Sequence, residues 1–163
     1  MGQLRLRPLR ADEYEAWRRA LVDGYAQDIE VNGNTPADAA REKAEADTSR
    51  ILPDGLATPG HAMFIAEDDG HPVGQLWIAE REMDGRQVLF IYDVEVREDE
   101  RGKGYGRETM LLAEDEARRR GVARIELNVF GGNEVARRLY RSLGYVERAV
   151  LMGKDLGAAE APR

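Results

Sequence analysis

Residues 101–106 read Arg-Gly-Lys-Gly-Tyr-Gly, and they connect a predicted strand, residues 88–96, to a predicted helix, residues 104–121. The three glycines allow successive backbone amides to point inward and allow a ligand to approach the main chain closely. The helix that follows adds unpaired N–H groups and the positive end of its dipole. Formal positive charge comes from Arg101, Lys103 and Arg107. The stretch therefore predicts a site for a ligand that carries phosphate groups.

Two common phosphate-binding loops do not fit residues 101–106. The loop of nucleoside triphosphatases ends in Gly-Lys-Ser/Thr, which this stretch lacks, so a phosphotransfer domain is excluded. The dinucleotide-binding motif reads Gly-x-Gly-x-x-Gly and follows a strand near the start of the chain, whereas this stretch lies in the second half. Taken alone, a glycine-rich turn between a strand and a helix is equally consistent with a tight turn that binds nothing.

The pattern on either side of the turn predicts one mixed α/β domain over residues 1–154, followed by a disordered tail at residues 155–163. Asp68-Asp69-Gly70 and Asp84-Gly85 are turn signatures that join three strands into an antiparallel meander. The expected strands are residues 3–8, 62–67, 73–81, 88–96, 124–130 and 145–152, and the expected helices begin near Asp12 and Pro36 and span residues 104–121 and 133–143.

The bulk composition excludes several classes of protein. With 163 residues the chain has the size of one domain, and a net charge of −7 argues against a nucleic-acid partner. The absence of cysteine excludes a disulfide framework and a thiolate metal site. No apolar run approaches a membrane span and no secretory signal is recognisable, so we expect a cytoplasmic protein without a membrane partner. Both histidines, His61 and His71, are expected at the surface, and no metal is expected.

Two motifs make the chain resemble the GNAT superfamily of N-acetyltransferases. Arg101, Gly104 and Gly106 match the pattern Arg/Gln-x-x-Gly-x-Gly/Ala that follows the fourth strand in that family. About 30 residues later, Asn133 to Tyr145 resembles Asn-x-x-Ala-x-x-x-Tyr-x-x-x-Gly-[Phe/Tyr]. The resemblance covers residues 62–152 and is only architectural before them. It implies a mixed, mostly antiparallel sheet of six to seven strands, flanked by four helices and splayed between strands 4 and 5.

The resemblance implies acetyl-CoA as the acetyl donor. Val94 and Val96 would lend backbone groups to the pantetheine arm, the turn would hold the pyrophosphate, and Tyr140 would protonate the departing thiolate. On periodicity alone Tyr140 is a core aromatic residue, and Asn133 is a good helix N-cap, so both also have a structural interpretation. The implied cofactor-binding residues are Val94, Val96, Arg101, Gly102, Lys103, Gly104, Tyr105, Gly106, Arg107 and Asn133.

The group that takes the proton from the amine is left open between Asp93, Glu95 and water. Which carboxylate faces the amine depends on where an expected β-bulge shifts the alternation of the strand. We favour Asp93, for which a structural role in fixing a neighbouring helix or loop is equally consistent with the pattern. Polyamine acetyltransferases carry a Glu-Asp pair here, but Tyr92 replaces the Glu in this chain.

The acceptor is predicted to be a small cationic amine. Residues 23–47 hold seven acidic and two basic side chains, which favours a cation by electrostatic steering, although a solvated helix face has the same composition.

Because a cysteine nucleophile is absent, we expect direct transfer in a ternary complex. A protein or peptide N-acetyltransferase and a CoA-binding regulatory module without turnover remain alternatives. Asn128 stands where enzymes that acetylate a ribosomal-protein N-terminus carry a Glu, which weakens the former. The resemblance also implies a homodimer.

Overall fold

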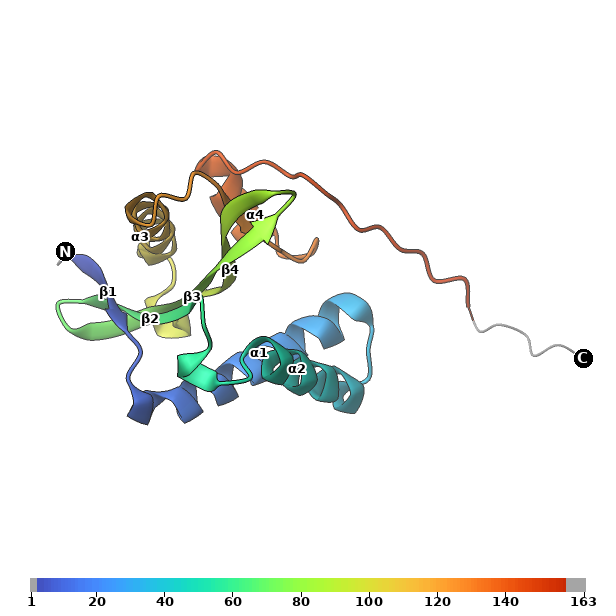
Figure 1. The fold of residues 1–163 in the computed structure, drawn as a ribbon. Helices are drawn as coiled ribbons and strands as arrows, with labels where there is room; N and C mark the ends of the chain where they lie inside the picture. Colours follow the sequence, from blue (N-terminus) through green and yellow to red (C-terminus); the bar gives the residue numbers. More distant parts are fainter. Residues whose placement is uncertain (1–2, 158–163) are drawn as a thin grey trace, which may run out of the picture.

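The computed structural model describes residues 3–157 and contains one sheet with the strand order β1-β2-β3-β4-β5 (Figure 1). The first four strands pair in antiparallel fashion and β5 pairs parallel to β4. The mixed, mostly antiparallel sheet is confirmed, but the expected count of six to seven strands is wrong, because the described part of the chain forms five. The strands are β1 (Leu4–Pro8), β2 (His61–Asp68), β3 (His71–Met83), β4 (Arg86–Val96) and β5 (Ile125–Leu127).

Within residues 3–157, four α-helices flank the sheet, as predicted (Figure 1). Two of them, α1 and α2, pack on each other through alanines such as Ala40 and Ala44, which have no exposed surface, and lie on one side of the sheet. The helix that follows the glycine-rich turn, α3, covers the other side. The helices are α1 (Tyr14–Gly33), α2 (Ala37–Ile51), α3 (Tyr105–Arg119) and α4 (Glu134–Ser142). No described helix is both long enough and apolar enough to span a membrane.

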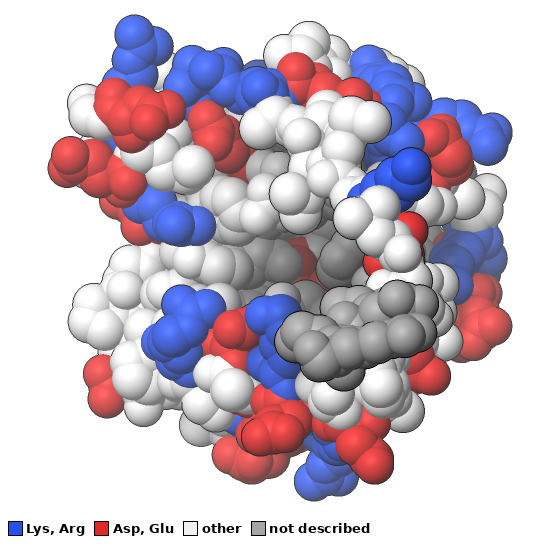
Figure 2. Space-filling view, turned by 90° about the vertical axis from the view of Figure 1, so that its right-hand side faces the viewer, with Lys and Arg blue, Asp and Glu red and all other residues white. Residues whose placement is uncertain are grey.

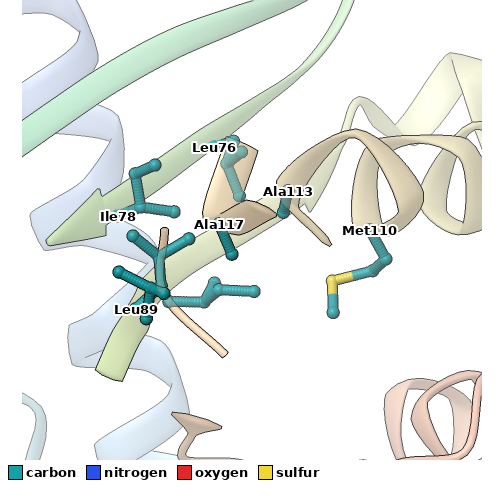
Figure 3. Close-up of a cluster of buried hydrophobic side chains, with 8 residues drawn as sticks. Leu76, Ile78, Leu89, Met110, Ala113 and Ala117 are labelled. Atoms are coloured by element: carbon teal, nitrogen blue, oxygen red, sulfur yellow. The ribbon is translucent and has the colours of Figure 1, made fainter. Parts of the chain in front are cut away.

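Buried clusters lie on both faces of the sheet. Between the sheet and α3, Leu76 and Ile78 pack with Met110 (Figure 3). On the opposite face Trp77 packs against Trp17 of α1. Successive residues of β3 therefore face opposite layers, as the alternation of a strand requires.

The last strand of the meander, β4, and the following strand, β5, separate after three residue pairs. Among the residues that the structure describes, β5 pairs with Leu89–Ile91 alone, whereas β3 continues to pair with β4 as far as Val96 on the other side. Within the described residues, the β5-side edge of β4 beyond Ile91 has no strand partner, so the predicted splay is confirmed. A bulge lies at the same place, because Trp77 pairs with Asp93 and the next residue of β3 pairs with Ile91.

The predicted last strand, residues 145–152, does not form. Residues 145–157 leave α4 as an extended segment without strand pairing, and Leu151 has a relative exposure of 101% (Figure 1). An alternating pattern becomes a strand only where a neighbouring strand accepts its backbone hydrogen bonds, and within the described residues the segment has one backbone bond, from the Tyr145 amide to the Tyr140 carbonyl at the end of α4. Of the expected tail, residues 158–163 lie outside the described residues.

Candidate active site

The glycine-rich turn lies between the end of β4 and the start of α3. Gly102 and Gly104 have φ values of +79° and +92°, which glycine adopts at little cost, and a Cβ on either would meet nothing within 4 Å. The amides of residues 102–106 make no backbone hydrogen bond in the described part of the chain, whereas those of Arg107 and Glu108 bond to the Gly104 carbonyl. Successive free amides at a helix N-terminus fit a pyrophosphate.

The basic side chains of the turn already have partners. Lys103 Nζ lies 2.7 Å from Glu100 Oε2, and Arg107 Nη2 donates a hydrogen bond of 2.8 Å to Ser142 Oγ of α4. Arg101 Nε donates to the last carbonyl of β4 at 3.2 Å. The expected formal charge is therefore partly neutralised, and the backbone amides provide the open part of the predicted anion site.

Tyr105 and Gly106 fix where the turn sits. Tyr105 OH donates a hydrogen bond of 2.6 Å to Asp68 Oδ2, and this bond raises the pKa of Tyr105 to about 12. A Cβ on Gly106 would lie 3.3 Å from Leu139 Cδ2 and 3.7 Å from Val96 Cγ2, so α3, α4 and β4 meet closely here. Both residues anchor the turn while their amides remain free of backbone partners.

Asp93 follows the bulged residue of β4 and lies enclosed by protein, with a small part of its surface open to solvent. Its Oδ2 accepts a hydrogen bond of 2.6 Å from Gln75 Nε2 of β3. Burial raises the pKa of Asp93 to about 7; the Gln75 hydrogen bond opposes this rise, while the charges of Glu95 and Asp28 add to it. A carboxyl group that titrates near neutral pH is suited to accept a proton from an amine.

Glu95 occupies a different environment on the same strand. Its side chain is 51% exposed, and Oε1 lies 3.7 Å from Arg101 Nη2. Asp93 and Glu95 both follow the bulge and share one face of the strand, so their surroundings distinguish them: Asp93 is largely enclosed and Glu95 is exposed.

The two candidate residues of the second motif lie at either end of α4. Asn133 Oδ1 accepts a hydrogen bond of 3.1 Å from the amide of Ala136, so its role as N-cap is confirmed. Tyr140 packs at the edge of the cluster under α3, with its ring 6.0 Å from that of Tyr145. Burial raises the pKa of Tyr140, and the charge of Asp93 raises it further, which keeps the hydroxyl protonated.

An aromatic wall stands beside Asp93 and was missed in the sequence. Trp77, its cross-strand partner, stacks on Tyr92 with ring centroids 4.5 Å apart. Trp77 Nε1 donates a hydrogen bond of 2.9 Å to His61 Nδ1, and His61, which was expected at the surface, is partly buried. Gln75 was also missed, although an amide inside the apolar run of residues 73–79 is a recognisable signal. Within residues 3–157, no group of three or more metal-ligating side chains is arranged around a common point.

The acidic side chains of α1 and α2 are partly paired. Figure 2 shows one face of the molecule, hollowed at its centre and bordered by side chains of both charges. In the described part of the chain Asp28, Glu30, Asp38 and Glu42 form no ion pair, and Asp28 is the one whose charge acts on Asp93. The paired residues are Asp23 with Arg41, Glu45 with Arg18, and Asp47 with Lys43 and Arg50.

A family model described as the acetyltransferase (GNAT) family matches residues 15–145. The chain belongs to the GNAT family. YycN, an uncharacterized N-acetyltransferase of Bacillus subtilis (strain 168), is 33% identical to this GNAT chain over 153 residues, which are 93% of the chain and 97% of YycN. The crystal structure of YycN superimposes with a TM-score of 0.90 at 30% identity, over 94% of this chain and 99% of the other. This GNAT protein is therefore an acyltransferase enzyme.

A more distant structure shows how widely the fold is shared. The aminoglycoside N-acetyltransferase AAC(6')-Iy in complex with CoA has a TM-score of 0.63 and 18% identity, and the superposition covers 97% of each chain. At this identity the likeness to the GNAT chain concerns the fold alone.

Proposed function

We propose that this GNAT enzyme transfers the acetyl group of acetyl-CoA to a primary amine by direct transfer in a ternary complex. The observation that carries the proposal is the junction at the end of β4. There the unpartnered edge of the strand, the free amides of residues 102–106 and the enclosed carboxyl group of Asp93 occur within one short stretch of chain. The CoA complex of AAC(6')-Iy, which has the same fold, supports a CoA site in this protein.

On the donor side the main chain does most of the binding. The amides of residues 102–106 hold the pyrophosphate, and the free edge of β4 at Val94 and Val96 binds the pantetheine arm in the manner of an added strand. The Asn133 side-chain oxygen is used by the helix cap, which leaves its amide nitrogen to contact the arm. Positive charge comes from the arginines and the lysine of the turn.

On the acceptor side one side chain accepts a proton and another donates one. Acetyl-CoA supplies a thioester, whose carbon–sulfur bond breaks as the carbon–nitrogen bond to the amine forms. Asp93 takes the proton that the nitrogen loses, and Tyr140 gives its proton to the departing sulfur. A β4 amide at or near Val94 stabilises the oxyanion, because backbone donors on a rigid strand need no reorganisation. No acyl-cysteine participates, since the sequence has no cysteine.

The acceptor that fits this side is a small cationic amine. Asp93 lies within the electrostatic influence of Glu95 and Asp28, and Asp28 forms no ion pair within the described residues. The carboxyl groups of Asp93, Glu95 and Asp28 favour a bound ammonium group. Their charge also attracts a cationic amine from solution.

A panel of amines tests the proposal through the release of CoA thiol. Matched cationic and neutral amines are compared at low and high ionic strength, with acetyl-CoA as donor. We expect thiol release with the cationic amines, and an advantage over neutral ones that shrinks as salt is added. Equal rates with neutral amines would contradict the cationic preference, reaction with peptides alone would indicate a peptide N-acetyltransferase, and CoA binding without thiol release would indicate a regulatory module.

The homodimer is likewise a proposal. The apolar side chains of the segment after α4 are exposed in the single chain, and a second copy that covered them would remove apolar surface from water. Light scattering on the purified enzyme measures the mass directly, and a monomer would contradict the proposal.

A further inference from the structure

Gln75 is a partly buried polar side chain that lies between buried apolar residues of β3. Its neighbours Val73 and Leu76 have no exposed surface, and Trp77 is 3% exposed. Its side-chain nitrogen Nε2 donates a hydrogen bond of 2.6 Å to Asp93 Oδ2. We propose that Gln75 is a positioning residue that holds Asp93 by one oxygen, so that Oδ1 is left to accept the amine proton. The inference rests on the proposed role of Asp93 as the base.

The register of the two strands places these side chains together. Trp77 pairs with Asp93 and Gln75 pairs with Glu95, so the amide reaches the carboxylate diagonally across the β3–β4 pair. The bulge at Tyr92 sets this arrangement, because without it a different residue would lie opposite Trp77.

The backbone at this point allows little movement. A Cβ on Gly74 would collide with the carbonyl oxygen of Glu95, so only glycine permits the approach of the two strands next to Gln75. Burial of the neighbouring apolar residues restricts the Gln75 side chain further. The hydrogen bond to Asp93 is therefore built into the strand pair, and it does not depend on a mobile surface side chain.

The titratable groups around Asp93 do not favour its ionised form. Two of them oppose its ionisation by their negative charge, and the pKa of a third is raised by the charge of Asp93. Glu95 on the same strand and Asp28 on α1 are acidic, and Tyr140 on α4 is neutral with a raised pKa. Gln75 is the one hydrogen-bond donor to the Asp93 side chain among the described residues. Removal of that donor is expected to raise the pKa of Asp93, because a hydrogen bond to the charged form favours that form.

The pH dependence of kcat for Gln75→Leu tests the inference. We expect the acidic limb of the profile to move to higher pH by about one unit, with the rate recovering to within about threefold of the unchanged enzyme at high pH. Gln75→Glu, which preserves the size of the side chain, is the second variant; its added carboxylate is expected to move the limb in the same direction. Gln87→Leu replaces an exposed glutamine of β4 and is expected to leave the profile unchanged.

Three results would overturn the inference. An unmoved limb in both Gln75 variants shows that Gln75 does not act on Asp93, and an equal loss of rate at every pH shows a role in packing only. Asp93→Asn, measured in parallel, tests separately whether Asp93 is the base. If the acidic limb survives in Asp93→Asn, the base is another group and the inference about Gln75 falls with it.

Discussion

The donor turn and the acceptor carboxyl group lie close together in the chain but are built in opposite ways. The turn uses main-chain amides, is open to solvent, and depends on glycines with positive φ at positions 102 and 104. The proposed acceptor side depends on the side chain of Asp93, which accepts a hydrogen bond from Gln75 and pairs across the strands with Trp77, whose ring stacks on Tyr92. Substitutions that change side chains should therefore affect the acceptor side strongly, whereas the donor side should respond mainly to changes in backbone freedom.

The largest effect is expected for Asp93→Asn. Loss of the base should lower kcat by about 10²- to 10⁴-fold. The folded-state pKa of Asp93 is about 7, against about 3.9 for an unfolded aspartate, so between these values the native state binds more protons. Stability is then lost as the pH rises from about 4 to about 7. At pH 8 the free energy of unfolding of Asp93→Asn should therefore exceed that of the unchanged protein by about 2–4 kcal/mol.

Urea unfolding at pH 5 and pH 8, together with kcat, measures both consequences of Asp93→Asn. Glu95→Gln is the matched control, because this exposed carboxylate lies on the same strand and should change the free energy of unfolding by less than about 0.5 kcal/mol. The gain in free energy of unfolding of Asp93→Asn over the unchanged protein should be larger at pH 8 than at pH 5. An equal gain at both pH values would show that burial does not raise the pKa of Asp93.

The next largest effect is expected for Tyr140→Phe. If the hydroxyl protonates the departing sulfur, kcat should fall by about 10²-fold while the fold is retained. Tyr145→Phe is the control, because Tyr145 is a neighbour in the same cluster and its buried hydroxyl has no hydrogen-bond partner in the described residues. Steady-state rates decide the matter, and equal losses in both variants would point to packing of α4 instead of proton transfer.

A smaller effect is expected on the donor side for Gly104→Ala. The strain of a φ of +92° costs a residue with a Cβ about 1–2 kcal/mol, so the KM for acetyl-CoA should rise about tenfold with little change in kcat. Gly24→Ala is the control, since Gly24 lies within α1 and a Cβ there meets nothing within 4 Å. An unchanged KM in Gly104→Ala would show that the turn does not hold the donor.

The same contrast explains what could be predicted from the sequence. The turn was recognisable because glycines and their spacing encode a backbone shape directly. The sequence does not decide between Asp93 and Glu95, because residues two apart on one strand share a face and only the packing around them shows that Asp93 is the enclosed one. Gln75 is recognisable as an amide inside an apolar run, but its contact with Asp93 requires the register of β3 and β4, because these residues are 18 positions apart in the sequence.

The fold shows a parallel division. The meander, the four helices and the splay follow from turn signatures, helical periodicity and the family resemblance, all of which are local or motif-based. The segment of residues 145–152 has the composition of a strand, yet it stays unpaired, because strand formation is decided by a neighbouring edge and not by the segment itself. Non-local pairing is thus the element that sequence reasoning missed in both the fold and the site.

The smallest effect is expected for Lys103→Ala, which changes a charge in the donor turn and leaves its glycines intact. Lys103 is already bonded to Glu100 and is half exposed, so its loss should raise the KM for acetyl-CoA by less than about threefold, and by less still at high salt. Measuring it beside Gly104→Ala sharpens the contrast between backbone and side chain. A larger rise for Lys103→Ala than for Gly104→Ala would show that Lys103 leaves Glu100 when the donor binds, and that charge outweighs the backbone amides at this site.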